Sequence, residues 1–299
     1  MKYLKRNWQL YTMVLPGVVL ILVFAYFPMY GIVMAFKRFK PTLGFFASPW
    51  ASPWYRYFEM ALKDAYFLRA FKNTLILGVE TLLITFPAPI ILALLFNELR
   101  EGPFKKGIQT LSYMPHFLST VVVVGILKLL LGSNGPMADL LGSLGLAWQN
   151  PFNYAESFRT LYIGSSLWTG VGYSSIIYLA AISGIDQEMY EAATIDGATR
   201  FQKIRHITLP SILPTVIILF IFAVSGVVSS DTGKILLMYN EGTYSTADVI
   251  GTFTYRKGIE NSANSSFAAA CGLFQTVIAF ILLATTNLIA RKLGETSLW

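Results

Sequence analysis

The residue types that most often carry out chemistry in proteins are scarce and scattered in this sequence. The two histidines, His116 in YMPHF and His206 in a basic stretch, do not have the spacing of metal ligands. The nearest approach to a phosphate-binding loop, GPFKKGI at 102–108, has Ile where GxxxxGK[ST] requires Lys. No paired carboxylates and no Ser, His and Asp grouping stand out either. We therefore predict no catalytic residue and no metal or ATP site in this chain.

Two further reactive side chains fall inside apolar stretches. Glu80 lies about two turns into one of them, where a charge at the centre of a bilayer would cost roughly 2.5–3.5 kcal/mol. It should face protein or water, and either a role in a transport pathway or a merely protonated or snorkelling carboxyl explains it. Cys271 is the single cysteine, which excludes a disulfide framework and a multi-cysteine metal site. We interpret it as a packing residue.

Composition places these side chains on membrane helices. The 299 residues are 55% hydrophobic and 13% charged, whereas soluble domains carry about a quarter charged residues. The first apolar run is too long for a removable signal peptide and lacks its cleavage site. Each run approaches the ~20 residues that cross a ~30 Å hydrocarbon core. We predict an all-α transmembrane bundle of about six spans, at 11–36, 73–97, 108–131, 159–183, 208–230 and 266–290.

The basic residues predict how the spans are oriented. The net charge of +7 comes from clusters at the ends of apolar runs, which indicates membrane anchoring and not nucleic-acid binding. The loop 132–157 has no Lys or Arg, so both termini are expected in the cytoplasm. One segment disagrees, because 37–72 is rich in Lys and Arg on the side assigned as outside. Part of it, WYRYFEMALKDAYFLRAF, is typical of an interfacial helix and should lie on the outer surface.

Two proline residues interrupt the second span. Pro87 and Pro89, in TFPAPIILALL, remove helix hydrogen bonds and permit a kink. Kinked bundles often enclose cavities, although kinks are also ordinary in membrane helices.

A polar stretch between the fourth and fifth runs predicts a helix–turn–helix elbow. Asp186 can cap a short helix, QEMYEAATI, with Glu188 in its first turn. Asp196-Gly197 then supplies a turn, and a second short helix can start over 198–207. A solvated connector would explain the charges of this elbow but not its alanines, which suit close packing in the groove of another protein.

Small, polar and aromatic residues mark the fourth span, SSLWTGVGYSSIIYL. Ser166, Gly170 and Tyr173 share one helical face, because they lie at i, i+4 and i+7. Aromatic rings and hydroxyls suit a carbohydrate, yet the same residue types also mediate packing of membrane helices or bond the backbone one turn back. The predicted substrate pathway comprises Ser166, Trp168, Thr169, Gly170, Tyr173, Ser225, Ser229 and Ser230.

The stretch EAATIDGA, followed by RFQKIRHITLP, resembles the EAA signature of binding-protein-dependent ATP-binding-cassette (ABC) importer permeases. The resemblance covers almost the whole chain and includes LALLFNELREGPFKKGIQTLSYMPHFLSTVVVVGIL and ADVIGTFTYRKGI. It is greatest to permeases for oligosaccharides and polysaccharides, including uronate-containing ones such as alginate. In that family the elbow couples to the cytoplasmic ATPase, and the resemblance assigns this role to Glu191, Ala192, Ala193, Asp196, Gly197 and Ala198.

The resemblance implies a type I importer permease fold in a bacterial inner membrane. Residues 1–68 would form an N-terminal span and outer segment, and 69–299 the permease domain with its coupling elbow at 186–207. The implied partners are a second, homologous permease, an ATPase dimer that holds ATP and Mg, an extracytoplasmic solute-binding protein, the sugar and membrane lipid. The alternatives are a permease for a non-sugar solute, an ion-coupled secondary transporter with Glu80 as its one relay candidate, and a membrane-embedded transferase.

Overall fold

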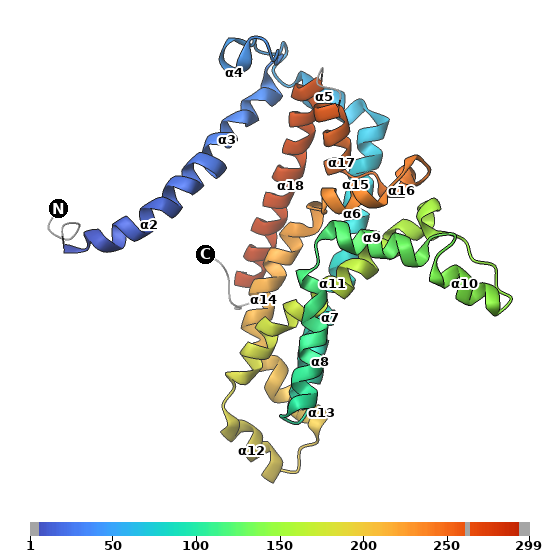
Figure 1. Ribbon diagram of the computed structural model, residues 1–299. Helices are drawn as coiled ribbons and strands as arrows, with labels where there is room; N and C mark the ends of the chain where they lie inside the picture. Colours follow the sequence, from blue (N-terminus) through green and yellow to red (C-terminus); the bar gives the residue numbers. More distant parts are fainter. Residues whose placement is uncertain (1–5, 261–263, 293–299) are drawn as a thin grey trace. The chain divides into compact units, whose positions relative to one another are not determined.

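The computed structural model describes residues 6–260 and 264–292, and helices dominate them (Figure 1). Within these ranges the only β-type pairing is an isolated bridge between Lys37 and Trp50. Backbone groups inside a bilayer must be hydrogen-bonded within the protein, and helices achieve this within one segment. The predicted all-α class is therefore confirmed.

Five helical segments are long and apolar enough to cross a membrane, and one bent pair brings the number to six in the described chain. The bent pair joins Ala155–Ser183 to Gln187–Ile195 at an angle of 70°. The prediction of about six spans is confirmed, although the third differs in position. The five segments are Trp8–Phe36, Ala65–Glu98, Thr120–Ser143, Arg200–Val228 and Ser265–Lys292.

The chain divides into two compact units, which are described separately. Unit 1 comprises the described parts of Met1–Leu68 and Phe253–Phe274. Unit 2 comprises Arg69–Thr252 and the described part of Gln275–Trp299. A compact unit is defined by packing alone, so the division of the sequence at residue 68 stays a prediction about domains.

Unit 1 contains the first span and a short surface helix, α5 (Arg56–Lys63). Phe36 packs against Trp54 and against Phe58 of the surface helix, with ring centroids 6.0 and 5.3 Å apart. Asp64 ends this helix and caps the next one by accepting hydrogen bonds from the backbone N–H groups of Tyr66 and Phe67. Only the first half of the predicted interfacial stretch is thus a separate helix, because Ala65 to Phe71 belong to α6 (Ala65–Thr85), the first helix of span two. The elements are α2 (Trp8–Ile21), η1 (Leu22–Tyr26), α3 (Phe27–Met29), η2 (Tyr30–Phe36), α4 (Gly44–Ala47) and α5 (Arg56–Lys63).

The second span is interrupted where its prolines lie. It consists of α6 (Ala65–Thr85) and α7 (Pro87–Glu98), which are separated at Phe86. Pro87 occupies the first turn of α7, where its missing N–H costs no helix hydrogen bond. The Thr85 hydroxyl donates to the Thr81 carbonyl at 2.8 Å and satisfies one backbone acceptor near the break.

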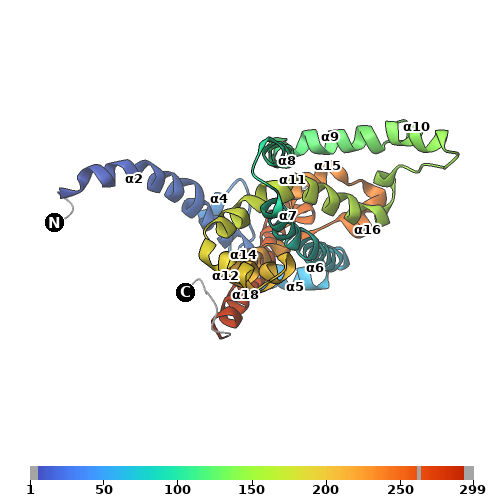
Figure 2. The same ribbon diagram turned by 90° about the horizontal axis from the view of Figure 1, so that it is seen from below.

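The third predicted span, 108–131, is wrong as a single helix. It is broken into α8 (Pro103–Tyr113), a 3₁₀ turn η3 (Met114–Phe117) and α9 (Thr120–Leu131), after which α10 (Pro136–Ser143) follows. Pro115 lies in the turn, and Ser119 caps α9 by accepting from the Val122 N–H at 3.3 Å. Figure 2 shows α8 nearly end-on and α9 lengthwise. The membrane-length segment here is therefore Thr120–Ser143.

The centre of unit 2 is α11 (Ala155–Ser183), which packs against α7, α8 and α14 (Leu209–Ser225). Glycine permits the closest approaches. A Cβ at Gly172 would lie 2.0 Å from the Ser112 carbonyl oxygen of α8, and one at Gly78 would lie 1.7 Å from the Val227 carbonyl oxygen. One apolar core forms around Leu77, Phe158, Ile235 and Met238, and a second around Ala93, Tyr178, Ile182 and Ile212.

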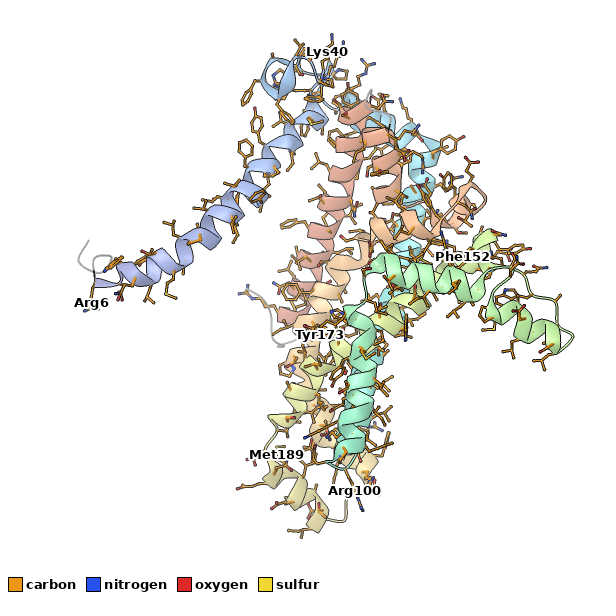
Figure 3. All side chains as sticks on the ribbon, in the orientation of Figure 1. Arg6, Lys40, Arg100, Phe152, Tyr173 and Met189 are labelled. Atoms are coloured by element: carbon orange, nitrogen blue, oxygen red, sulfur yellow. The ribbon has the colours of Figure 1, made fainter. Side chains whose placement is uncertain are left out.

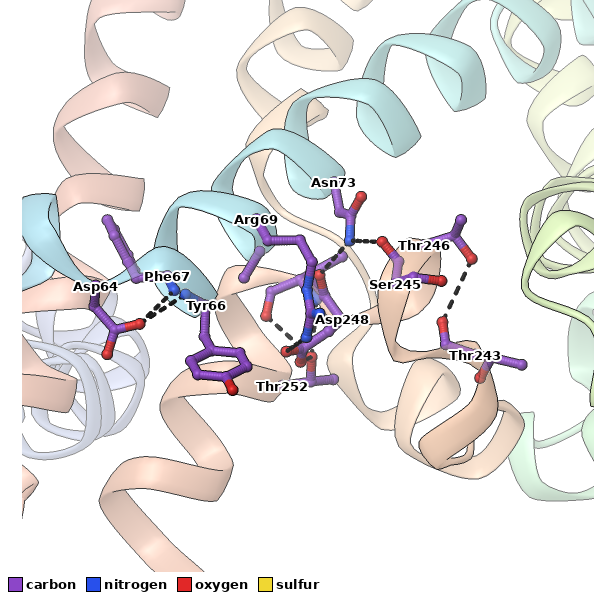
Figure 4. Close-up of polar contacts among 12 residues, drawn as sticks. Asp64, Tyr66, Phe67, Arg69, Asn73, Thr243, Ser245, Thr246, Asp248 and Thr252 are labelled. Carbon is purple, nitrogen blue, oxygen red and sulfur yellow. Dashed lines mark hydrogen bonds and ion pairs between the residues drawn. The ribbon is translucent and has the colours of Figure 1, made fainter.

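A polar network in unit 2 fixes the chain after span five (Figure 4). The Asn73 amide donates to the carbonyls of Ser245 and Asp248 at 2.9 and 3.0 Å. The Asp248 carboxylate is fully buried, accepts from the Thr252 hydroxyl at 2.8 Å and lies 4.0 Å from Arg69. A buried carboxylate needs such partners. The remaining elements are η4 (Pro151–Asn153), η6 (Gly226–Val228), α15 (Thr232–Met238), η7 (Glu241–Thr243), α16 (Tyr244–Ala247), α17 (Ile250–Tyr255), η8 (Arg256–Glu260) and α18 (Ser265–Lys292).

Candidate functional site

The elbow begins with α12 (Gln187–Ile195), whose cap is the predicted one. The Asp186 side chain accepts from the Glu188 N–H at 3.0 Å. At the other end Gly197 has φ +77°, a left-handed conformation that other residues adopt only with strain. The Ala198 N–H reaches back to the Ala193 carbonyl at 2.8 Å and closes the helix. The sharp turn is thus built from the DG dipeptide.

The second arm of the elbow starts later than predicted. Ala198 is used to close α12, so Thr199 caps α13 (Arg200–Lys203), and the π-turn η5 (Ile204–Thr208) leads into α14. Thr199 and Gln202 form a reciprocal capping box. Two side-chain contacts then hold the arms together: Lys203 Nζ donates to Thr194 Oγ1 at 2.7 Å, and the Tyr190 and Thr208 hydroxyls are 2.9 Å apart.

The outer surface of the elbow carries two large apolar side chains among polar ones. Ile195 is 87% exposed and Phe201 is 69% exposed, so a protein partner that covered them would remove apolar area from water. The predicted coupling residues Glu191, Ala192, Asp196 and Gly197 are also exposed, whereas Ala193 and Ala198 are half-buried. Figure 3 labels Met189 in α12 and Arg100 after α7 at the same end of unit 2. This end carries a surface suited to a protein partner.

A cavity of about 410 Å³ lies between α6, α7, α11 and α14 in unit 2. Of the predicted pathway residues, Tyr173, Ser229 and Ser230 line it. Trp168 lines a different hollow beside α7 and α8, and Thr169 and Ser225 bond the backbone one turn back. Ser166 and Gly170 are not among the described residues that line the cavity between α6, α7, α11 and α14. The predicted set is therefore divided between the cavity and helix packing, and its role in transport stays a prediction.

Tyr173 has an aromatic partner that the sequence did not single out for this place. The His116 ring stacks on it with centroids 3.9 Å apart and an interplanar angle of 2°, and Phe117 meets it edge-on at 6.2 Å. His116 reaches this position because the turn at Pro115 breaks the helix. The signal was the proline in YMPHF, since proline breaks a helix and so changes the direction in which the chain and its next side chains continue.

Ser166 is bound to a buried lysine that sequence reasoning also missed. Lys234 Nζ donates to Ser166 Oγ at 2.7 Å and to the Tyr162 carbonyl at 3.2 Å, and it lies 4.8 Å from the Tyr162 ring centre. Burial lowers the pKa of Lys234 to about 8, although Asp231 opposes the shift. The Asp231 N–H donates to the Tyr162 hydroxyl at 3.0 Å. Ser166 thus positions α15 against α11.

Glu80 faces protein, as predicted, but it is paired. Arg159 Nη1 lies 3.4 Å from Glu80 Oε1, and the two side chains are 26% and 40% exposed. Arg159 follows directly on the loop that has no basic residue. Glu80 therefore takes part in an ion pair that joins α6 to α11.

Membrane-length helices around a cavity whose lining includes Tyr and Ser side chains, together with an exposed helix–turn–helix elbow, are features of a membrane transport component. The model of the family described as "Binding-protein-dependent transport system inner membrane component" matches residues 85–295. The chain belongs to this family, so the resemblance of EAATIDGA is confirmed. Members are transport components of the inner membrane and not enzymes.

Relatives are similar over nearly their whole length. Protein LplB of Bacillus subtilis (strain 168) is 39% identical over 100% of this chain and 93% of its own. The polygalacturonan/rhamnogalacturonan transport system permease protein YteP of the same organism is 38% identical over 97% of this chain and 90% of its own. One chain in the crystal structure of a bacterial ABC transporter involved in the import of the acidic polysaccharide alginate is similar to this chain, with a TM-score of 0.89, 39% identity and coverage of 97% of this chain and 98% of that one. The predicted type I permease fold is confirmed.

Proposed function

We propose that this chain is the transmembrane permease subunit of an ATP-driven importer of oligosaccharides or polysaccharides, with acidic, uronate-containing chains as its cargo. The observation that supports this proposal most directly is the TM-score of 0.89 to the alginate importer over 97% of the chain. A second solved structure of that transporter, with 38% identity over 99% of both chains, includes a periplasmic protein bound to an alginate pentasaccharide.

The proposed assembly contains a homologous second permease, two ATPase subunits and an extracytoplasmic solute-binding protein. ATP and Mg²⁺ belong to the ATPase subunits. The exposed apolar tip at Ile195 and Phe201 supplies the contact with an ATPase. Both termini and the elbow face the cytoplasm, and the segment from Lys37 to Asp64 faces outside.

Coupling follows from how the elbow is joined to the cavity walls. α12 follows α11 after a 70° bend, and η5 leads directly into α14. Tyr173 of α11 and Ala223 of α14 line the same cavity. When the ATPases close, the elbow moves and carries these two helices with it, which changes access to the cavity.

Cargo binding in the cavity follows from its lining. The exposed side of the Tyr173 ring packs against the C–H face of a sugar, while His116 keeps the ring in place. The Ser229 and Ser230 side chains hydrogen-bond the sugar hydroxyls.

The test is to purify the complex with its partners and reconstitute it in liposomes. Uptake of a labelled oligouronate should require ATP and the binding protein, and the loaded binding protein should stimulate ATP hydrolysis. Uptake driven by an ion gradient without ATP would show a secondary transporter instead. Uptake restricted to a neutral or non-sugar solute would overturn the cargo.

A further inference from the structure

The outer basic segment has no role in the transport cavity or the elbow. Lys and Arg are expected mainly in cytoplasmic loops, yet 37–72 is rich in both on the side proposed as outside. Within unit 1, Arg38, Lys40 and Arg56 line a cavity of about 330 Å³, which we call the outer basic cavity. Figure 3 labels Lys40, which lies in the loop before α4. Neither transport nor coupling explains why three cations line one cavity.

The backbone that carries two of these cations is fixed on both sides. The Phe39 N–H donates to the buried Ser266 hydroxyl at 3.0 Å, and that hydroxyl donates to the Lys37 carbonyl at 2.7 Å. The Arg38 N–H donates to the Pro49 carbonyl at 2.8 Å, and the Lys40 N–H donates to Ser48 Oγ at 3.0 Å. The cavity is therefore a preorganised feature of unit 1, so a ligand meets fixed backbone.

The cations of the cavity are not neutralised within the described chain. None of its described lining residues is acidic, and Arg38, Lys40 and Arg56 take part in none of the salt bridges between described residues. By contrast, Lys63 on the same surface helix is paired with Glu59 at 2.5 Å. Like charges that share a cavity repel each other, and a bound anion would offset this repulsion.

The other lining residues indicate which anion fits. Phe39 and Tyr57 contribute half-buried aromatic rings, and Asn264 contributes an exposed amide. Aromatic rings cover the C–H faces of sugars, amides bond their OH groups, and Arg forms paired hydrogen bonds with carboxylates. A simple phosphate or chloride would use the cations alone. A sugar that carries a carboxylate would use all three kinds of side chain.

We propose that the outer basic cavity is a binding site for the uronate units of an acidic oligosaccharide, separate from the transport cavity. The proposal rests on the proposed function, because it requires this segment to face outside and the cargo to be acidic. It also accounts for the segment that breaks the charge rule for membrane loops. Charge at the entry side raises the local concentration of an anionic cargo.

The test compares a triple variant, Arg38→Gln with Lys40→Gln and Arg56→Gln, with the control Lys63→Gln. Lys63 is an exposed cation of α5 outside the cavity. Equilibrium dialysis of the purified complex without binding protein measures binding of a hexuronate tetrasaccharide and of its carboxyl-reduced, neutral analogue. The triple variant should bind the hexuronate about tenfold more weakly, whereas the control should not change. Added salt should weaken wild-type binding and narrow the difference between the two.

The proposal would be overturned if the triple variant and the wild type bound the hexuronate equally. It would also be overturned if the wild type bound the hexuronate and its neutral analogue equally. Unchanged hexuronate binding with lost capture of the binding protein would assign the cavity to that protein. Unchanged hexuronate binding with a loss of copurifying phosphatidylglycerol would assign it to lipid. These outcomes differ from failure of the proposed function, in which the wild type imports no oligouronate at all.

Discussion

Gly197 is the residue whose conformation is most constrained by its place in the elbow. Its φ is +77°, and a side chain there would meet no atom within 4 Å, so a substitution acts through backbone strain alone. Gly197→Val should cost about 1–3 kcal/mol locally and abolish uptake and stimulated ATP hydrolysis. Assembly, measured by copurification of the partners, should survive. Gly107→Val, at an open helical site without positive φ, is the control. Normal uptake by the Gly197 variant would contradict the coupling assignment.

Tyr173 should matter for cargo because its ring lines the cavity while His116 covers one face. Tyr173→Ala should raise the KM for oligouronate uptake about tenfold and leave basal ATP hydrolysis unchanged. Trp168→Ala, on the same helix but in another hollow, should retain near-normal KM. If both variants lose uptake equally, the effect comes from α11 packing and the assignment to cargo fails.

Lys234 should make stability depend on pH in a direction opposite to that of a salt-bridged lysine, whose pKa is raised on folding. Its pKa is lowered to about 8 in the folded chain from an ordinary 10.5, so between these values the unfolded state binds more protons. Stability should therefore rise between about pH 8 and pH 10.5, by at most about 1.4 kcal/mol per pH unit. Thermal unfolding of the purified complex measures this rise. Lys234→Met should remove it, and a wild type with falling stability in this window would refute the prediction.

Among the elements, the contact between α8 and α11 depends on a missing side chain. A Cβ at Gly172 would lie 2.0 Å from the Ser112 carbonyl oxygen, whereas one at Gly164 of the same helix would meet nothing within 4 Å. Gly172→Ala should therefore destabilise the complex by about 1–3 kcal/mol, and Gly164→Ala should be nearly neutral. Thermal unfolding compares the two variants. Equal stability would mean that α8 moves away at little cost.

Elements whose signals are local could be predicted from the sequence. The interruption before Pro87, the cap at Asp186 and the turn at Gly197 each follow from the conformational preferences of one residue. The third span failed because hydropathy treated 108–131 as one apolar run, while Pro115 breaks it. Hydropathy measures transfer to a membrane and is insensitive to helix direction.

The site was less predictable than the spans, because its contacts join distant parts of the chain. Helical periodicity placed Ser166 and Tyr173 on one face, yet Ser166 binds Lys234, 68 residues away, and only Tyr173 lines the cavity. The stacking of His116 on Tyr173 likewise depends on how η3 packs on α11. Periodicity gives the face of a helix but does not identify what packs against that face.

At the scale of the whole molecule, orientation is the prediction with the widest consequences. After replacement of the buried Cys271 by Ala, a cysteine at the exposed Lys106 should react only with cytoplasmic reagent. Cysteines at Phe46 and Leu146, which are 82% and 57% exposed, should react only from outside. Labelling in intact cells and in inverted vesicles distinguishes the sides. The reverse pattern for Phe46 alone would place the outer basic cavity in the cytoplasm.

The two side-chain hydrogen bonds that hold the arms of the elbow together have an evolutionary consequence. The hydrogen bonds from Lys203 to Thr194 and between Tyr190 and Thr208 lie within residues 190–208, as do the exposed Ile195 and Phe201, whereas Tyr173 lies in α11. Under the proposed function, a substitution at Ile195 or Phe201 alters which ATPase binds the elbow and leaves the lining of the transport cavity intact. A change in the cavity has the converse effect. Specificity for the ATPase and specificity for the sugar can then be selected as separate traits. One ATPase can therefore come to serve several permeases.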